Sequence, residues 1–288
     1  MASLKDIRNR IGSVKSIQQV TRAMKMVAAA KMRKAQERME QARPYADRLK
    51  SEILTLLPDV DRSLLELLDI REIKRTAVVV ITSDRGLAGS FNTNIIKRAE
   101  DEIAEIGKEN VDLFCIGRRG CEYFKNRNYN IIEDHTDFWA ELDFNHSIKI
   151  GNGIISHFTT RKVDQIRVVY NEFKNVMVQE IIAETLLPLT LDEDVEIDSS
   201  ERIYEPSKEL IIKSLIPLDI NVQIWRYLLE SFASEQAARM VAMENATLNA
   251  GDLIRDLTRQ FNNARQAAIT TEILEIVGGA EALKQEKG

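Results

Sequence analysis

The chain has 288 residues, enough for one large domain or two modest ones, each with its own hydrophobic core. Hydrophobic residues make up 44% and charged residues 30%, a balance too apolar for a disordered chain and too charged for a membrane-spanning one. The net charge of −5 hides an uneven distribution, because nine of the first 34 residues are Lys or Arg against a single acid, Asp6. A basic segment of this density favours anionic partners without saying which kind.

The first predicted element is one long helix over residues 1–57, a range that contains one Gly and one Pro. Small and apolar residues recur in steps of four and three from Ala35 to Leu56, which is the heptad pattern of coiled-coil packing. Because this pattern keeps its phase on both sides of Pro44, we expect an unbroken helix that ends at Pro58 and is about 80 Å long. The pattern continues upstream, less regularly, through Leu4, Ile7, Ile11, Val14, Ile17, Val20, Met24 and Val27.

Residues 74–190 are predicted to form an α/β domain in which strands alternate with helices. The run Thr76–Thr82 is apolar and β-branched throughout, which is typical of a buried parallel strand. This alternation predicts a Rossmann-like layered fold, with a tight turn at Lys174-Asn175 before the last strand. The other predicted strands are 111–116, 129–132, 165–170 and 176–182, and the predicted helices are 92–107, 118–126 and 147–160.

An acidic stretch and a second long helix complete the chain. Residues 192–205 carry seven acids against Arg202, and we interpret 191–206 as an acidic linker. A helix is predicted over 207–286, with a kink or break at Pro217. Its candidate packing positions, many of them small, are Ile224, Leu228, Ser231, Ala238, Val241, Leu248, Leu257, Phe261, Ala264, Ala268 and Val277. The sequence therefore predicts an antiparallel coiled coil of the N- and C-terminal helices plus a central α/β domain at one end.

Two glycines after the first strand raise the possibility of a phosphate-binding loop. Gly86 and Gly89 have the spacing Gly-x-x-Gly, which lacks the third glycine of a dinucleotide loop and the Lys-Ser/Thr of a P-loop. Asp84 also places an acid where a phosphate loop needs bare amides. A structural turn is therefore favoured over a nucleotide site.

The histidines and cysteines do not show the spacing of a metal or redox site. His135, His146 and His157 recur every eleven residues, and only the last two fit on one long helix. Cys115 and Cys121 are six apart, which fits neither a C-x-x-C redox pair nor a zinc site, so two reduced thiols are expected. No catalytic, cofactor-binding or metal-binding residue is predicted in this chain.

Four long segments carry the most specific patterns in the chain. They are SIQQVTRAMKMVAAAKMR at 16–33, SDRGLAGSFN at 83–92, SEQAARMVAMENAT at 234–247 and NARQAAITTEILEIVGGA at 263–280. In this order they resemble the gamma chain of the bacterial-type F-type ATP synthase. The resemblance covers the whole chain and implies a central rotor shaft. Such a shaft couples proton-driven rotation of a membrane ring to ATP synthesis or hydrolysis in an alpha3-beta3 head.

The resemblance also implies partners and a location. The implied partners are the alpha and beta subunits, at one copy of this chain per three of each, the epsilon subunit and the c-ring, with no nucleic acid. The implied location is the cytoplasmic face of the cell membrane, as a peripheral subunit. The chain would then be a non-catalytic subunit of a proton-translocating enzyme, without a cofactor of its own.

Individual contact residues follow only from the resemblance. It implies that Tyr204 and Glu205, which precede Pro206, belong to a foot that approaches the membrane ring. Simple seam packing is the alternative for Met24, and a polar outer face is the alternative for Gln266 and Thr270. The residues implied to contact the catalytic subunits are Met24, Arg239, Arg265, Gln266 and Thr270.

Two other classes of function stay open on the sequence. A nucleic-acid-binding coiled coil would use the basic N-terminal helix, although residues 1–44 contain no aromatic residue for stacking on bases. A nucleotide-dependent enzyme would need polar groups that converge in a pocket at the strand ends near residues 83–92.

Overall fold

The computed structural model describes residues 4–61, 65–189 and 204–285. The chain divides into two compact units, residues 28–239 on the one hand and residues 1–27 with 240–288 on the other. Two long helices, α1 (Leu4–Leu56) and α5 (Lys208–Gln285), contribute to both units. Most of the predicted acidic linker at 191–206 lies outside the described residues, which resume at residue 204.

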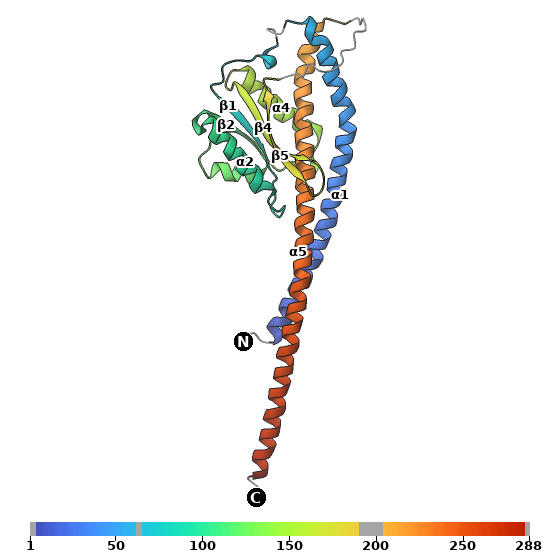
Figure 1. Ribbon diagram of the computed structural model, residues 1–288, viewed down its shortest axis with the longest axis vertical. Coiled ribbons are helices and arrows are strands. Elements are labelled where there is room, and N and C mark those ends of the chain that lie inside the picture. Colours follow the sequence, from blue (N-terminus) through green and yellow to red (C-terminus); the bar gives the residue numbers. More distant parts are fainter. Residues whose placement is uncertain (1–3, 62–64, 190–203, 286–288) are drawn as a thin grey trace. The chain divides into compact units, whose positions relative to one another are not determined.

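The unit of residues 28–239 contains a five-stranded sheet with the order β3-β2-β1-β4-β5 (Figure 1). Its first four strands run parallel, and the last pairs antiparallel with its neighbour. This order is that of a doubly wound Rossmann-like sheet with an antiparallel closing strand, so the predicted fold class is confirmed. The strands are β1 (Thr76–Ile81), β2 (Val111–Ile116), β3 (Ile131–His135), β4 (Gln165–Phe173) and β5 (Gln179–Leu187).

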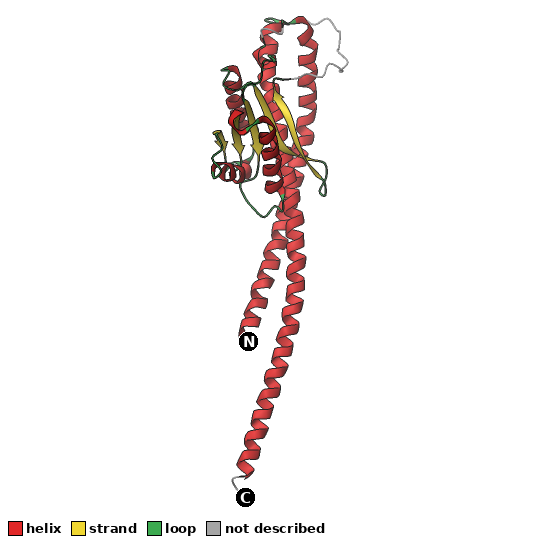
Figure 2. Ribbon diagram, turned by 60° about the vertical axis from the view of Figure 1, so that its left-hand side comes forward, coloured by secondary structure: helices red, strands yellow, loops and turns green. Residues whose placement is uncertain are grey.

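Helices cover both faces of this sheet (Figure 2). On one face, Val78 and Val80 pack with α2 (Phe91–Ile106) and α3 (Arg118–Lys125). On the other face, alternate residues of β1 pack with α4 (Phe144–Thr159) and with those parts of α1 and α5 that belong to this unit. Because both faces are buried, β1 has no polar side, which explains its uninterrupted apolar sequence.

Both strands at the edges of the sheet lie further along the chain than predicted. Strand β3 begins at Ile131, not at residue 129, and continues through three polar residues to His135. Strand β5 begins at Gln179, not at residue 176. Asn175 holds the preceding turn, because its side-chain oxygen accepts hydrogen bonds from the amides of Met177 and Val178 at 2.9 Å each.

Neither proline interrupts its helix. Pro44 lies inside α1, as predicted, and Pro217 lies inside α5, where a kink or break was expected. The expected break is wrong because the neighbouring side chains are held in the core, Ile216 at 2% and Ile220 at 0% exposure. Tertiary packing of the helix here outweighs one lost backbone hydrogen bond.

Helices α1 and α5 pack against each other within residues 28–239. Leu49, Ile53 and Leu56 of α1 share a core cluster with Ile212 and Leu228 of α5. The heptad seam predicted from Ala35 onward is therefore buried or half-buried throughout.

The seam of α1 within residues 4–27 differs from the prediction. Predicted members Ile17, Val20 and Val27 are 55%, 57% and 56% exposed. Predicted members Leu4, Ile7, Ile11, Val14 and Met24 are buried or half-buried. Gln18, Thr21 and Lys25, which were not predicted, are buried or half-buried as well, and they continue from Val14 in steps of four, three and four. The three residues that were not predicted are polar, so a search for apolar periodicity passes over them.

The seam of α5 within residues 240–278 is equally regular. Predicted members Leu248 and Val277 are 63% and 53% exposed, and Ala268 is exposed as well. Met243, Ala250 and Leu257 are buried at steps of seven, and Val14 of α1 joins the last two in one cluster. The helices run antiparallel, since Gln18 contacts Thr247 and Lys25 contacts Glu244.

Candidate functional site

In the loop after β1, the carboxylate of Asp84 binds the backbone amides that a phosphate would need. Asp84 accepts hydrogen bonds from the backbone amides of Arg118, at the start of α3, and of Asp137, both at 2.9 Å. Ser83 and Asn92 tie the two ends of the loop together with a 3.0 Å hydrogen bond. An anion at this helix N-terminus would therefore meet a carboxylate that already holds the amide, which opposes phosphate binding.

Arg239 of α5 is held inside the unit of residues 28–239. Its guanidinium donates to the carbonyl oxygen of Gly86 at 2.8 Å and pairs with Glu235, and its side chain is 11% exposed. Glu235 is itself buried, and burial raises the pKa of its carboxyl while Arg239 opposes that effect. The geometry gives Arg239 a structural task, which is to anchor the loop after β1 to α5.

The three histidines do not form one site. His135 and His157 contact the two oxygens of Glu133 at 3.2 and 3.3 Å, whereas His146 belongs to the capping box of α4 with Asp143. In residues 4–61, 65–189 and 204–285, no group of three His, Cys, Asp or Glu side chains has the arrangement of a metal site. Both cysteines are buried and free.

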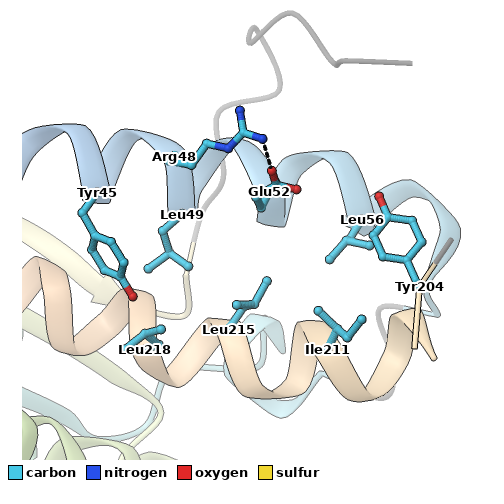
Figure 3. Close-up of a pocket in the computed structure, with 9 residues that line it drawn as sticks. All are labelled: Tyr45, Arg48, Leu49, Glu52, Leu56, Tyr204, Ile211, Leu215 and Leu218. Carbon is cyan, nitrogen blue, oxygen red and sulfur yellow. Dashed lines mark ion pairs between the residues drawn. The ribbon is translucent and has the colours of Figure 1, made fainter. Parts of the chain in front are cut away.

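Tyr204 lies at a groove between α1 and α5 (Figure 3). The groove has a volume of about 320 Å³, and its walls are mainly apolar. Leu49 and Leu56 line it from α1, and Leu215 lines it from α5, while Arg48 pairs with Glu52 at its rim (2.7 Å). Glu205, next to Tyr204, is exposed.

The far end of α5 is exposed along its described length. After Leu257, residues 258–278 are exposed except for two half-buried side chains, Phe261 and Ala264. Figure 1 shows α5 continuing beyond the first described residue of α1. Five large apolar side chains are 47–65% exposed on this segment: Ile269, Ile273, Leu274, Ile276 and Val277. The sequence analysis named the polar residues here through the resemblance, and of the five apolar residues it named only Val277, as a helix-packing position.

The predicted contact residues fall into three structural classes. Arg265, Gln266 and Thr270 are exposed on the far end of α5, and Thr270 donates to the Gln266 carbonyl at 2.9 Å. Met24 is half-buried on α1, and Arg239 is engaged within its own unit. None of the helices in the described ranges has the length and apolar content needed to cross a bilayer.

Comparisons with known proteins agree with this arrangement. A family model described as "ATP synthase" matches residues 3–283. The ATP synthase gamma chain of Chlorobium phaeobacteroides is 51% identical over 290 residues, covering 99% of this chain and all of the relative. That of Chloroherpeton thalassium is 48% identical and covers 99% of each chain.

Solved structures give the same result. A chain from the central stalk and c-ring of the Tetrahymena thermophila mitochondrial ATP synthase is 26% identical, with a TM-score of 0.61, covering 79% of this chain and 99% of its own. A chain of the Euglena gracilis mitochondrial ATP synthase is 19% identical and shares the fold, with a TM-score of 0.71 over 99% of this chain and 96% of its own. The length, the motifs and these matches together show that the chain belongs to the ATP synthase gamma chain family.

Proposed function

We propose that this chain works as the central rotor shaft of an F-type ATP synthase by differential binding, without chemistry of its own. The head of alpha and beta subunits surrounds the far end of α5. Each orientation of the shaft favours a different conformation of each catalytic subunit, so rotation changes their affinities in turn. The observation that carries the proposal is the run of large apolar side chains exposed on residues 269–277. A contiguous exposed apolar surface marks a site of interaction with a partner.

The far end of α5 is one-sided, as a shaft that distinguishes its neighbours must be. At about 100° per residue, the five exposed apolar residues and the three predicted contact residues all fall within about half of the helix circumference. The opposite half carries Ala267, Thr271, Glu275 and Gly278, which are small or polar. Arg265, Gln266 and Thr270 therefore share a face with the apolar side chains. We assign this face to contact with a catalytic subunit.

The other predicted residues take different places in the proposal. Tyr204 and Glu205 belong to the foot that meets the c-ring, which the neighbouring apolar groove supports. The epsilon subunit and c-ring complete the partners, and the chain sits peripherally at the cytoplasmic face of the membrane. Met24 is proposed to contact a catalytic subunit through the exposed part of its side chain. Arg239 acts indirectly, by fixing the loop after β1.

Photo-crosslinking in the intact ATP synthase tests this assignment. A photoreactive phenylalanine at Gln266 or Thr270 reports what the proposed face touches, and the same probe at Ala267 or Thr271 on the opposite face is the matched control. We expect Gln266 and Thr270 to crosslink mainly to one beta subunit per complex, in a pattern that the control positions do not share. Equal crosslinking from both faces, or crosslinks to a different class of molecule, would contradict the one-sided contact.

A further inference from the structure

The coiled coil in residues 4–27 and 240–264 contains a polar layer within an otherwise apolar seam. On α1, Gln18 and Thr21 occupy seam positions, and Thr21 is 8% exposed. On α5, Thr247 lies between the buried seam residues Met243 and Ala250. The layer is bordered by an ion pair in which Lys25 Nζ lies 2.7 Å from a Glu244 oxygen.

The hydrogen bonds of this layer fit together across the two helices. The hydroxyl oxygens of Thr21 and Thr247 are 2.7 Å apart, and Thr247 also lies 2.7 Å from the carbonyl oxygen of Met243. The Thr21 hydroxyl also lies 3.1 Å from the carbonyl oxygen of Gln18, so one threonine donates to the other and the second donates to a carbonyl of its own helix. Gln18 donates its side-chain amide to the carbonyl oxygen of Thr247 at 3.3 Å.

Gly251 makes room for this arrangement. A Cβ at this position would lie 3.1 Å from the side-chain nitrogen of Gln18, tighter than an ordinary contact. Glycine inside a helix is otherwise unfavourable by roughly 1 kcal/mol relative to alanine. The close approach to Gln18 therefore gives Gly251 a reason to occupy the middle of α5.

The apolar part of the seam does not by itself define one alignment. A shift of α5 by one heptad would still place apolar residues opposite Ile11 and Val14, because the α5 seam repeats with the same period. The same shift would bring Thr21 opposite Met240 or Ile254, whose side chains cannot form a hydrogen bond, so the hydrogen bond between the two threonine hydroxyls would be lost. Within residues 4–27 and 240–264, the polar layer and the bordering ion pair between Lys25 and Glu244 therefore distinguish the native alignment from the shifted ones.

We infer that Gln18, Thr21 and Thr247 form a register lock, which holds α1 and α5 at a single axial alignment. These are positioning residues, because they act through the helices and not through contact with a catalytic subunit. Their part in coupling rests on the proposed shaft function, since the alignment determines the level at which the exposed face of residues 265–277 stands relative to α1. A single polar position within an apolar seam is a known means of specifying register.

Disulfide trapping in the assembled ATP synthase measures the register directly. The pair K25C/E244C joins positions that touch in the native alignment, and the pair K25C/G251C joins positions that meet only after a one-heptad shift. Each pair is combined with T21V/T247V, which removes both hydroxyls at nearly constant volume. Because a buried hydrogen bond is lost, we expect the shifted disulfide to increase at least roughly tenfold, with a corresponding decrease of the native one. No increase in the shifted disulfide would overturn the lock.

Two further variants separate a lock from ordinary stabilisation. T21S/T247S keeps both hydroxyls and should restore the native disulfide, whereas I254V loosens the apolar seam and should leave the register unchanged. We expect protons pumped per ATP hydrolysed to decrease in T21V/T247V and to recover in T21S/T247S. If I254V shifts the register or uncouples pumping as strongly as T21V/T247V, the role is structural and the inference is wrong. Since the disulfide readout requires no coupling, it stands apart from the fate of the proposed function.

Discussion

Glu230 of α5 is expected to make the stability of residues 28–239 depend on pH near neutrality. Its side chain is 14% exposed, and one of its oxygens is buried without a hydrogen-bond partner among the described residues. Arg226 is the nearest cation, 3.9 Å away, and it also pairs with Glu184 at 3.1 Å. Burial raises the pKa of Glu230 from an ordinary 4.5 to about 7, with Glu172 and Glu184 adding to the effect and Arg226 opposing it.

The sign follows from the higher pKa in the folded state. The folded protein favours the neutral carboxyl, so the stabilisation is complete below the unfolded pKa and is lost as the pH rises through about 7. A change from 4.5 to about 7 corresponds to about 3 kcal/mol between fully protonated and fully ionised Glu230. Between pH 5 and pH 8 the expected loss is about 2 kcal/mol, since part of the titration lies below pH 5.

The variant E230Q removes this titration and keeps the shape of the side chain. Urea unfolding followed by the fluorescence of Trp139 and Trp225, both packed on the core of this unit, gives the free energy of unfolding at each pH. We expect E230Q to exceed the unsubstituted chain by about 2–3 kcal/mol at pH 8 and by less than about 1 kcal/mol at pH 5. E105Q, at an exposed position on α2, should show no such dependence. An equal difference at both pH values would refute the reasoning.

Three further predictions concern the loop anchors and the exposed face. G117A should lower the free energy of unfolding by about 2 kcal/mol or more in urea titrations, because φ is +89° and the added Cβ would lie 2.1 Å from the Thr82 carbonyl oxygen; an unchanged midpoint would count against this geometry. R239A should lower the free energy of unfolding by about 3–5 kcal/mol, because it leaves the Glu235 carboxylate buried without its cation. The double variant R239A/E235Q should recover part of that loss in a double-mutant cycle. Q266A/T270A should leave the free energy of unfolding unchanged and lower ATP-driven proton pumping in membrane vesicles; normal pumping would exclude both residues from the coupling contact.

The sequence was most informative where burial and periodicity coincide. Strand β2 matches its predicted range of 111–116, because an element buried on both faces is mostly apolar along its length, here with Asp112 as the one charged residue. The heptad seam from Ala35 to Leu56 was equally clear. Both belong to regions in which hydrophobic burial alone determines the structure.

Other features could not be predicted because polar side chains carry them. Strand β3 at the sheet edge is Ile-Ile-Glu-Asp-His, which lacks the apolar pattern of a strand. Thr21 in the α1 seam satisfies its hydroxyl with Thr247, more than two hundred residues away, and no local pattern reveals such a partner. The internal engagement of Arg239 by Gly86 likewise depends on tertiary structure. Resemblance located the candidate contact face, whereas its one-sided apolar character required the structure.

The native mass of the complex purified through a tag on this chain tests the shaft function most directly. The account predicts an ATP-hydrolysing assembly with three alpha subunits, three beta subunits and one copy of this chain. A homodimer of this chain without alpha and beta subunits, or a complex rich in nucleic acid, would contradict it.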